Sequence, residues 1–412
     1  MVSELRAFPD GTRIVTFEQD DGSTVVRLEA DGKELSRTSI FPYLMRIGEA
    51  VLRMDGIGGV ATGEEYRYRG YSRRVLEAAV EWMRNGDAAL ATLYGIPDYY
   101  PKFGFATCGP EYTVILPLSE EVPPPSLPEG WTFRDFTPGD PGDLPAVQEI
   151  YRSTTGHASG AIVREGGDST NAAARKISAR PWEILAAEGF TAEGDACRVL
   201  LNEGGDLVGY LWIGLSGWWV QTREPRAPEV MRFGEALARD PRSADVLVEA
   251  ARLWAGEVAS ETRQIEFIIP PEGHLAQALA YRAGIYAARY TWEGEFMARV
   301  LDVERFVRQL LPELAAQVRA ARLPLEGALT IRTDEGEVTL AIGADGVTLG
   351  GPGSGGLVVE LPQAILARIA MGAFEVRDVI ARLDNAVDDD AVALLEVLFP
   401  RRYPHIYAMD RF

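Results

Sequence analysis

The chain has 412 residues, of which 47% are hydrophobic and 25% charged, as expected for a globular protein of about two or three domains. Its formal net charge of −20 argues against nucleic acid as a partner, because phosphate would be repelled, and favours a cationic substrate. The two cysteines, Cys108 and Cys197, argue against a disulfide framework and favour a reducing, cytoplasmic compartment.

No feature of the sequence indicates a membrane or a metal partner. There is no charged and apolar leader segment at the start and no apolar run of membrane-spanning length. The three histidines, His157, His274 and His405, lie far apart. None has the spacing to Cys, Asp or Glu that is typical of metal sites, so we expect no metal.

Residues 1–50 are predicted to be rich in strands. Asp-Gly pairs at 21–22 and 31–32 are hairpin-turn signals between segments of alternating hydrophobicity. No helical periodicity precedes Ser72.

A further strand is predicted at 51–54, and it runs into Gly56, Gly58 and Gly59. Glycine within a strand indicates a bulge or a close approach of the backbone to a ligand. Backbone groups of a splayed strand must find partners other than a neighbouring strand. The residues that we expect to present such groups are Val60, Ala61 and Thr62.

A helix is predicted from Ser72, because apolar residues recur with helical spacing at Val75, Leu76, Ala79, Val80 and Met83. Gly70 permits a sharp turn before it, and Ser72 is a candidate N-cap. The first-turn N–H groups carry partial positive charge, and three arginines of the segment 67–73 lie beside them. This combination favours a pyrophosphate site, although an ordinary capped helix with solvated arginines would have the same pattern.

A strand at 88–94 and an aromatic segment at 99–105 follow. The block from 54 to 105 resembles the acyl-CoA site of the GCN5-related N-acetyltransferases (GNAT). Their pyrophosphate motif, Arg/Gln-x-x-Gly-x-Gly/Ala, is matched by Arg67, Gly70 and, with a small departure, Ser72. Their tyrosine before Gly-Phe is matched by Tyr100 before 104–105. The resemblance implies an α/β acetyltransferase domain that uses acetyl-CoA as co-substrate.

The resemblance also implies roles for individual residues. Tyr100 would donate a proton to the departing CoA sulfur, with Tyr99 as the rival, and the backbone of residues 60–62 would pair with the pantetheine arm. The pyrophosphate would be held by Arg67, Tyr68, Arg69, Gly70, Tyr71, Ser72 and Arg73. The family usually has two helices between its first two strands, and they wall the acceptor pocket. None is predicted here, so either other domains build that wall or the site is open.

A proline-rich segment at 117–130 reads as a stiff linker to a second unit. Strands are predicted at 131–136, 197–201, 207–213, 229–237 and 264–269, and helices at 143–153, 242–254 and 274–283. This order repeats the acetyltransferase fold. The segment 240–244, where its pyrophosphate loop should lie, contains no glycine, so we expect this copy not to bind acyl-CoA.

Residues 298–412 are predicted to form a third unit. One or two helices at 302–321, with Pro312 breaking the pattern, precede short strands at 327–332, 336–342 and 346–349 and helices at 361–371 and 389–398. This pattern resembles the sterol carrier protein fold. The segment 399–412 is rich in aromatic and apolar residues, which favours a docked tail over a frayed one.

The whole chain resembles the enhanced-intracellular-survival (Eis-like) acetyltransferases. The implied fold class is α/β (α+β), with an active acetyltransferase unit at 1–126, a degenerate copy at 127–297 and a sterol-carrier-like unit at 298–412. In that family the terminal carboxylate reaches the active centre, which here assigns Phe412 as the group that orients or deprotonates the amine. The resemblance also implies a homo-oligomer, often a hexamer.

Two functions remain open on the sequence. One is acetyl transfer to a primary amine of a cationic acceptor, such as a polyamine, an aminoglycoside, or a lysine-like or peptide amine. The alternative is a non-catalytic carrier, in which the third unit binds an apolar ligand and the first has lost its acceptor wall. The intact motif from Arg67 to Ser72 favours the enzyme.

Overall fold

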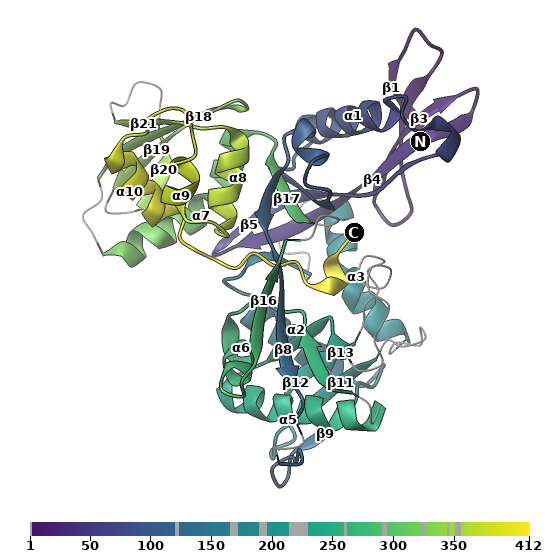
Figure 1. The fold of residues 1–412 in the computed structure, drawn as a ribbon, viewed down its shortest axis with the longest axis vertical. Helices are drawn as coiled ribbons and strands as arrows, with labels where there is room; N and C mark the ends of the chain where they lie inside the picture. The colour runs from purple at the N-terminus through teal and green to yellow at the C-terminus, as the bar shows by residue number, and fades with distance from the viewer. Residues whose placement is uncertain are drawn as a thin grey trace.

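The computed structural model describes residues 2–119, 123–164, 172–188, 196–213, 230–258, 262–290, 295–322, 326–343, 346–350 and 356–412. Residues 120–122 of the expected linker and residue 229 of an expected strand lie outside these ranges. The chain folds into three bodies, and its C-terminus lies between the first two (Figure 1). No helix in the described part of the chain is long and apolar enough to cross a membrane.

The first body is built on a nine-stranded sheet with the order β1-β2-β3-β4-β5-β6-β17-β7, to which β10 is added beside β4. Strands β1 to β5 form an antiparallel meander, and β5 and β6 are parallel. The predicted strand-rich start is therefore confirmed. The bounds are β1 Val2–Ala7, β2 Arg13–Glu18, β3 Thr24–Ala30, β4 Lys33–Ile47, β5 Ala50–Thr62, β6 Leu90–Gly95, β7 Ala106–Gly109, β10 Ser159–Ile162 and β17 Glu295–Val300.

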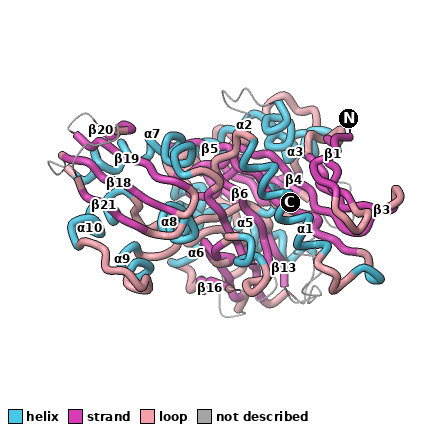
Figure 2. The backbone as a smooth tube through the Cα atoms, turned by 90° about the horizontal axis from the view of Figure 1, so that it is seen from above, coloured by secondary structure: helices cyan, strands magenta, loops and turns pink. Residues whose placement is uncertain are grey.

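Helix α1 (Tyr71–Asn85) covers one face of this sheet (Figure 2). Its apolar stripe, including Val75 and Leu76, is buried with Ile57 of β5 and Leu93 of β6 in one core cluster. The opposite face packs against α7 (Val303–Ala321) of the third body, whose Phe306 joins a second cluster. Burial on both faces explains why the central strands carry near-continuous apolar runs.

The second body has two four-stranded sheets, ordered β14-β12-β11-β9 and β13-β15-β8-β16. Its strands are β8 Glu111–Pro117, β9 Thr132–Asp135, β11 Cys197–Leu201, β12 Leu207–Trp212, β13 Val230–Phe233, β14 Glu235–Ala238, β15 Gln264–Phe267 and β16 Ile285–Arg289. Its helices are α2 Asp143–Thr154, α3 Ala172–Glu188, α5 Pro241–Val258 and α6 Gly273–Ala280.

The first two bodies exchange a strand. Strand β8 follows the first sheet in the chain but pairs with β15 and β16 of the second body. Strand β17 follows the second body in the chain but pairs with β6 and β7 of the first sheet. The sheets therefore cross the predicted boundaries at 126–127 and 297–298, and separating the two bodies would break main-chain ladders in both.

The third body packs α7 against a four-stranded sheet ordered β20-β19-β18-β21. Its other bounds are β18 Gly327–Thr333, β19 Gly336–Gly343, β20 Gly346–Leu349, β21 Leu357–Glu360, α8 Gln363–Met371, α9 Val376–Ile380 and α10 Asp389–Leu398. Pro312 lies inside α7 and does not divide it. The helix continues because residues on both sides of the proline, such as Val307 and Leu314, are buried in the same core, which holds the two halves in line.

Two further predictions need correction. Residues 230–238 form two strands in different sheets, separated at Gly234, and not one strand. Ser72 is not the N-cap of α1, because Gly70 occupies that position with φ +77° and the helix begins at Tyr71. A glycine reaches this left-handed conformation without steric cost, so no side-chain cap is required for the turn itself.

Candidate active site

The strand β5 diverges from β6 after Ile57. The two strands pair in parallel from Met54 with Leu90 to Ile57 with Leu93. Beyond that point β5 continues to Thr62 and pairs only with β4. We call the place beyond the last pair, between residues 58–62 of β5 and the end of β6, the β5–β6 split. Main-chain groups of β5 that point into it have no neighbouring strand on that side among the strands that the structure describes.

A bulge on the β4 side accompanies this divergence. Arg37 is paired with Ala61 and Ser39 with Gly58, so that two residues of β5 oppose one of β4. Gly59, at the bulge, has φ +59°. The predicted bulge among the strand glycines is confirmed, and such a bulge bends the strand and redirects its backbone groups.

The N-terminus of α1 is open to solvent and has no side-chain cap. Tyr68 and Gly70 both have positive φ, +64° and +77°, and a side chain at Gly70 would meet no atom within 4 Å. The Arg67 guanidinium lies 3.9 Å from Glu64, with both side chains exposed. The first-turn N–H groups thus face solvent beside arginines, as a phosphate site requires. The neighbouring positions are exposed or half-buried, and they are Arg67, Tyr68, Arg69, Tyr71, Ser72 and Arg73.

The two adjacent tyrosines have different environments. The Tyr99 hydroxyl lies 2.7 Å from the Ser72 hydroxyl at the start of α1. The Tyr100 ring packs edge-on against Tyr99 and Phe105, and its hydroxyl bonds to no residue that the structure describes. Burial raises the pKa of Tyr100 to about 12, because removal from water penalises the phenolate.

The chain's last residue lies against the glycines of β5. A side chain at Gly56 would meet the Phe412 ring at 2.5 Å, and one at Gly58 would meet the terminal carboxyl carbon at 2.9 Å. The Phe412 ring also packs against Phe41 and Tyr43 of β4, with centroid distances of 6.1 and 5.4 Å. Only glycine leaves room for this approach.

Tyr100 and Phe412 lie against opposite faces of the two strands. Gly56 contacts Phe412 and is paired with Thr92 of β6. Gly95 contacts the Tyr100 ring and lies three residues after Thr92 on the same strand. Since side chains alternate between the two faces of a sheet, an odd separation places these contacts on opposite faces. The terminal carboxyl and the phenol therefore lie on either side of the β5–β6 split.

Helix α3 of the second body packs on β4 beside this carboxyl. The Ser178 hydroxyl accepts a hydrogen bond from the Leu44 N–H, and Ile177 is buried with Tyr43. The first body has no α-helix before α1 among its described residues, and α3 covers part of β4. A neighbouring body thus supplies a wall on this face.

Sequence reasoning missed one titratable residue of β5. Asp55 is 7% exposed, and its carboxyl group makes no hydrogen bond or ion pair with a residue that the structure describes. Burial raises the pKa of its carboxyl to about 7. Asp55 directly precedes Gly56, the residue that lies against Phe412. No signal in the sequence indicated it, because a single aspartate within an apolar strand is not a recognisable motif.

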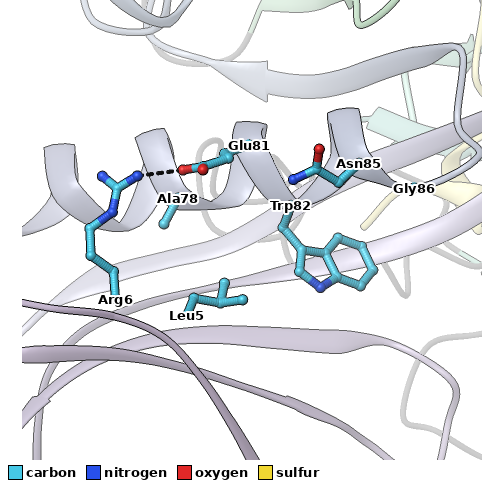
Figure 3. Close-up of a pocket in the computed structure, with 7 residues that line it drawn as sticks. All are labelled: Leu5, Arg6, Ala78, Glu81, Trp82, Asn85 and Gly86. Carbon is cyan, nitrogen blue, oxygen red and sulfur yellow. Dashed lines mark hydrogen bonds and ion pairs between the residues drawn. The ribbon is translucent and has the colours of Figure 1, made fainter.

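A separate hollow of about 370 Å³ lies between β1 and α1. Leu5 and Trp82 line it, and an ion pair of 2.5 Å joins Arg6 to Glu81 at its side (Figure 3). None of the residues that contact the β5–β6 split contributes to it. The geometry of the split, and not this hollow, defines the candidate site.

Residues 15–108, which contain the bulged strand, α1 and the two tyrosines, match the family model for the acetyltransferase (GNAT) domain. This segment is therefore similar in sequence to a GNAT acetyltransferase domain. This domain includes β2 to β7 and, in space, the tail that ends at Phe412. A comparison with curated proteins finds no match.

The fold of the whole chain is similar to that of several solved structures. One is a probable N-acyltransferase from Enterococcus faecalis, with 14% identity, a TM-score of 0.69, and coverage of 95% of this chain and 89% of the other. A GCN5-related N-acetyltransferase from Kribbella flavida has 17% identity, a TM-score of 0.64 and coverage of 94% and 87%. Eis1 from Mycobacterium abscessus has 14% identity, a TM-score of 0.57 and coverage of 94% and 90%. At these identities the similarity shows a shared fold, and the likeness of the third body to sterol carrier proteins stays a prediction.

Proposed function

We propose that the protein transfers the acetyl group of acetyl-CoA to a primary amine of a cationic acceptor, such as a polyamine, an aminoglycoside or a lysine-like amine. The observation that carries the proposal is the placement of the terminal carboxyl of Phe412 at Gly58, across the β5–β6 split from Tyr100. A carboxylate and a phenol on either side of one split are suited to handle an amine and a leaving group.

The residues around the split fit acetyl-CoA. Backbone groups of Val60, Ala61 and Thr62 would hold its pantetheine arm, and the solvent-facing N-terminus of α1, with the residues from Arg67 to Arg73, would hold its pyrophosphate. The co-substrate supplies an activated acetyl thioester. A main-chain N–H directed into the split would polarise the thioester carbonyl, as in an oxyanion hole.

Tyr100 is suited to serve the leaving sulfur. Its raised pKa of about 12 keeps the phenol protonated throughout the neutral range, and its hydroxyl is not engaged by a described residue. A thiol such as Cys has a pKa of about 8.5, so complete proton transfer from the phenol is unfavourable without close positioning. We therefore assign Tyr100 as a hydrogen-bond donor to the sulfur. The phenol proton moves to the sulfur as the carbon–sulfur bond of the thioester breaks. Tyr99 is the weaker candidate because its hydroxyl is paired with Ser72.

Phe412 is suited to bind the amine. Its ring packs with those of Phe41 and Tyr43, and aromatic faces attract ammonium groups. The carboxylate attracts the same charge, and it receives the proton that the amine must lose, directly or through water. The net charge of −20 would favour approach of a cation.

The proposal includes a homo-oligomer, often hexameric in the family that the chain resembles, a cytoplasmic location, and functional units at 1–126, 127–297 and 298–412. Sedimentation of the purified protein tests the assembly. These features follow from the resemblance and from composition, and the site chemistry does not depend on them.

The test is acetyl-CoA consumption with a panel of polyamines, aminoglycosides and lysine peptides. We expect turnover with at least one cationic amine, and its loss when Phe412 is deleted while CoA binding, measured by calorimetry, remains. Turnover by the deletion variant equal to that of the full chain would remove the carboxylate from the reaction. Absence of CoA binding by the full chain would overturn the proposed function itself.

A further inference from the structure

The second body contains a charged cluster that is completely buried. Arg164 lies between two carboxylates, with its Nη1 3.0 Å from Glu235 and its Nε 2.9 Å from Asp410. All three side chains have no solvent exposure. The rings of Tyr151 and Trp182 stack on the guanidinium at 4.0 and 4.6 Å. A buried guanidinium with this many partners is held in one geometry.

The cluster lies where the second body repeats the strand divergence of the first. Strand β13 pairs in parallel with β15, and after Gly234 the chain continues as β14, which pairs with β12 and with no other strand of the described residues. Glu235 is the first residue of β14. In the first body the equivalent place is the β5–β6 split. In the second, Tyr407 and Met409 of the tail are buried in the core of the body beside this divergence.

The same cluster holds the segment that ends at the candidate active site. Asp410 stands two residues before Phe412, and the Tyr151 hydroxyl adds a contact of 3.3 Å to its carboxylate. Arg411, between them, pairs with Glu111 of β8 at 2.7 Å. Asp410 is thus bound by the second body, Arg411 by the exchanged strand, and the Phe412 ring by the first sheet.

Further back, the main chain of the tail is fitted to β10, the strand that pairs with β4 of the first sheet. The His405 N–H donates to the Ser159 carbonyl at 2.8 Å, and a side chain at Gly160 would lie 2.8 Å from the His405 nitrogen. The course of the tail from the third body to the first sheet is visible in Figure 1 as the yellow segment. The tail is therefore held at 405, 407, 410 and 411 before its last residue reaches Gly58.

We propose that Arg164 is a positioning residue for the terminal carboxylate: it binds Asp410 in the place where a second acyl-CoA split would begin, and so holds the Phe412 carboxylate at Gly58. The second body would then serve the reaction of the first as a dock for the tail, even though it has no glycine in its own phosphate-loop segment. This inference rests on the proposed function for its catalytic consequence, but the docking itself can be measured without turnover.

The test measures release of Phe412 by carboxypeptidase A from the folded full-length chain. Two variants are used, Arg164→Met and Asp410→Asn, because loss of the buried arginine leaves two uncompensated carboxylates and can prevent folding. Asp410→Asn keeps the Arg164 and Glu235 pair, so its fold is retained. The control is Arg152→Met, which removes an arginine that is paired with Glu149 where both side chains are more than half exposed.

We expect at least tenfold faster release of Phe412 from Asp410→Asn than from wild type or from Arg152→Met. Its kcat for amine acetylation should fall at least tenfold, whereas its KM for acetyl-CoA should not change, because the phosphate site at α1 is untouched. A release rate equal to that of wild type would overturn the anchoring role of Arg164. Faster release with unchanged kcat would support the anchoring role of Arg164 but would contradict the proposed catalytic role of the Phe412 carboxylate.

Discussion

The substitution Gly56→Ala should displace the terminal residue without disturbing the rest of the site. The added methyl group would lie 2.5, 2.6 and 2.7 Å from three carbons of the Phe412 ring. Carbon atoms in contact prefer about 3.5–4.0 Å, so the ring must move by roughly 1 Å. Since the ring and the terminal carboxylate belong to one residue at a free chain end, the carboxylate moves with it.

The expected size of the effect follows from this displacement. Misplacement of a reacting group by about 1 Å costs on the order of 100-fold in rate, which corresponds to about 2.7 kcal/mol of activation free energy. The free energy of unfolding should change little, because the obstructing atoms are at the end of the chain and can yield. Acetyl-CoA binding should remain, since the α1 terminus lies elsewhere on the domain.

The assay is steady-state kinetics with acetyl-CoA and the best amine, together with a thermal melt. A matched control is Gly256→Ala in α5, where a new methyl group would meet no atom within 4 Å. That change should leave kinetics unaltered and stabilise the helix by roughly 0.5–1 kcal/mol. A wild-type kcat for Gly56→Ala would refute the reasoning, as would a loss of activity explained by unfolding alone.

Three further predictions concern other groups of the domain. Tyr100→Phe should slow the chemical step by about 100-fold or more at every pH below the phenol's pKa of about 12. Tyr99→Phe should affect mainly the KM for acetyl-CoA. Single-turnover rates that are alike for the two variants would contradict the assignment. Gly70→Ala strains a residue with φ +77° by about 1–2 kcal/mol and should weaken CoA binding in calorimetry. The control Gly139→Ala, at φ +80° in the second body, bears the same strain away from the site and should not. Asp55→Asn should raise the free energy of unfolding progressively as pH rises from about 4 to 7, and by up to about 4 kcal/mol above pH 7. The reason is that the folded pKa of this carboxyl is raised to about 7, so its ionisation destabilises the folded wild-type protein. Equal differences between variant and wild type in urea unfolding at pH 5 and at pH 8.5 would exclude this.

Local chemistry was sufficient to predict the central part of the domain. The apolar spacing from Val75 to Met83 predicts α1, and the five residues of that predicted stripe are all buried. Glycines within β5 predict a bulge, which occurs at Gly59. These features depend on neighbours in sequence, and so the sequence contains the whole signal.

Features that depend on distant contacts could not be predicted. Ser72 has the residue type of an N-cap, but its hydroxyl is paired with Tyr99, 27 positions away. The exchange of β8 and β17 joins residues such as Thr92 and Ala298, whose pairing no local pattern specifies. Helix α3 was missed because Pro181 lies inside it and proline normally ends a helical pattern.

The buried charges illustrate the same limit. Arg164, Glu235 and Asp410 stand far apart in the chain, and each alone reads as an ordinary surface charge. Only the fold shows that they meet with no exposure to solvent. The resemblance pointed to Phe412 as a site residue, but nothing in the sequence indicated what would hold it there.

The most direct measurement is amide hydrogen exchange with and without saturating acetyl-CoA. If the β5–β6 split and the α1 terminus seat the co-substrate, peptides that contain residues 58–62 and 70–73 should become protected, while the sheet of the third body should exchange unchanged. Protection confined to other parts of the chain, with these two segments unaffected by bound acetyl-CoA, would contradict the account.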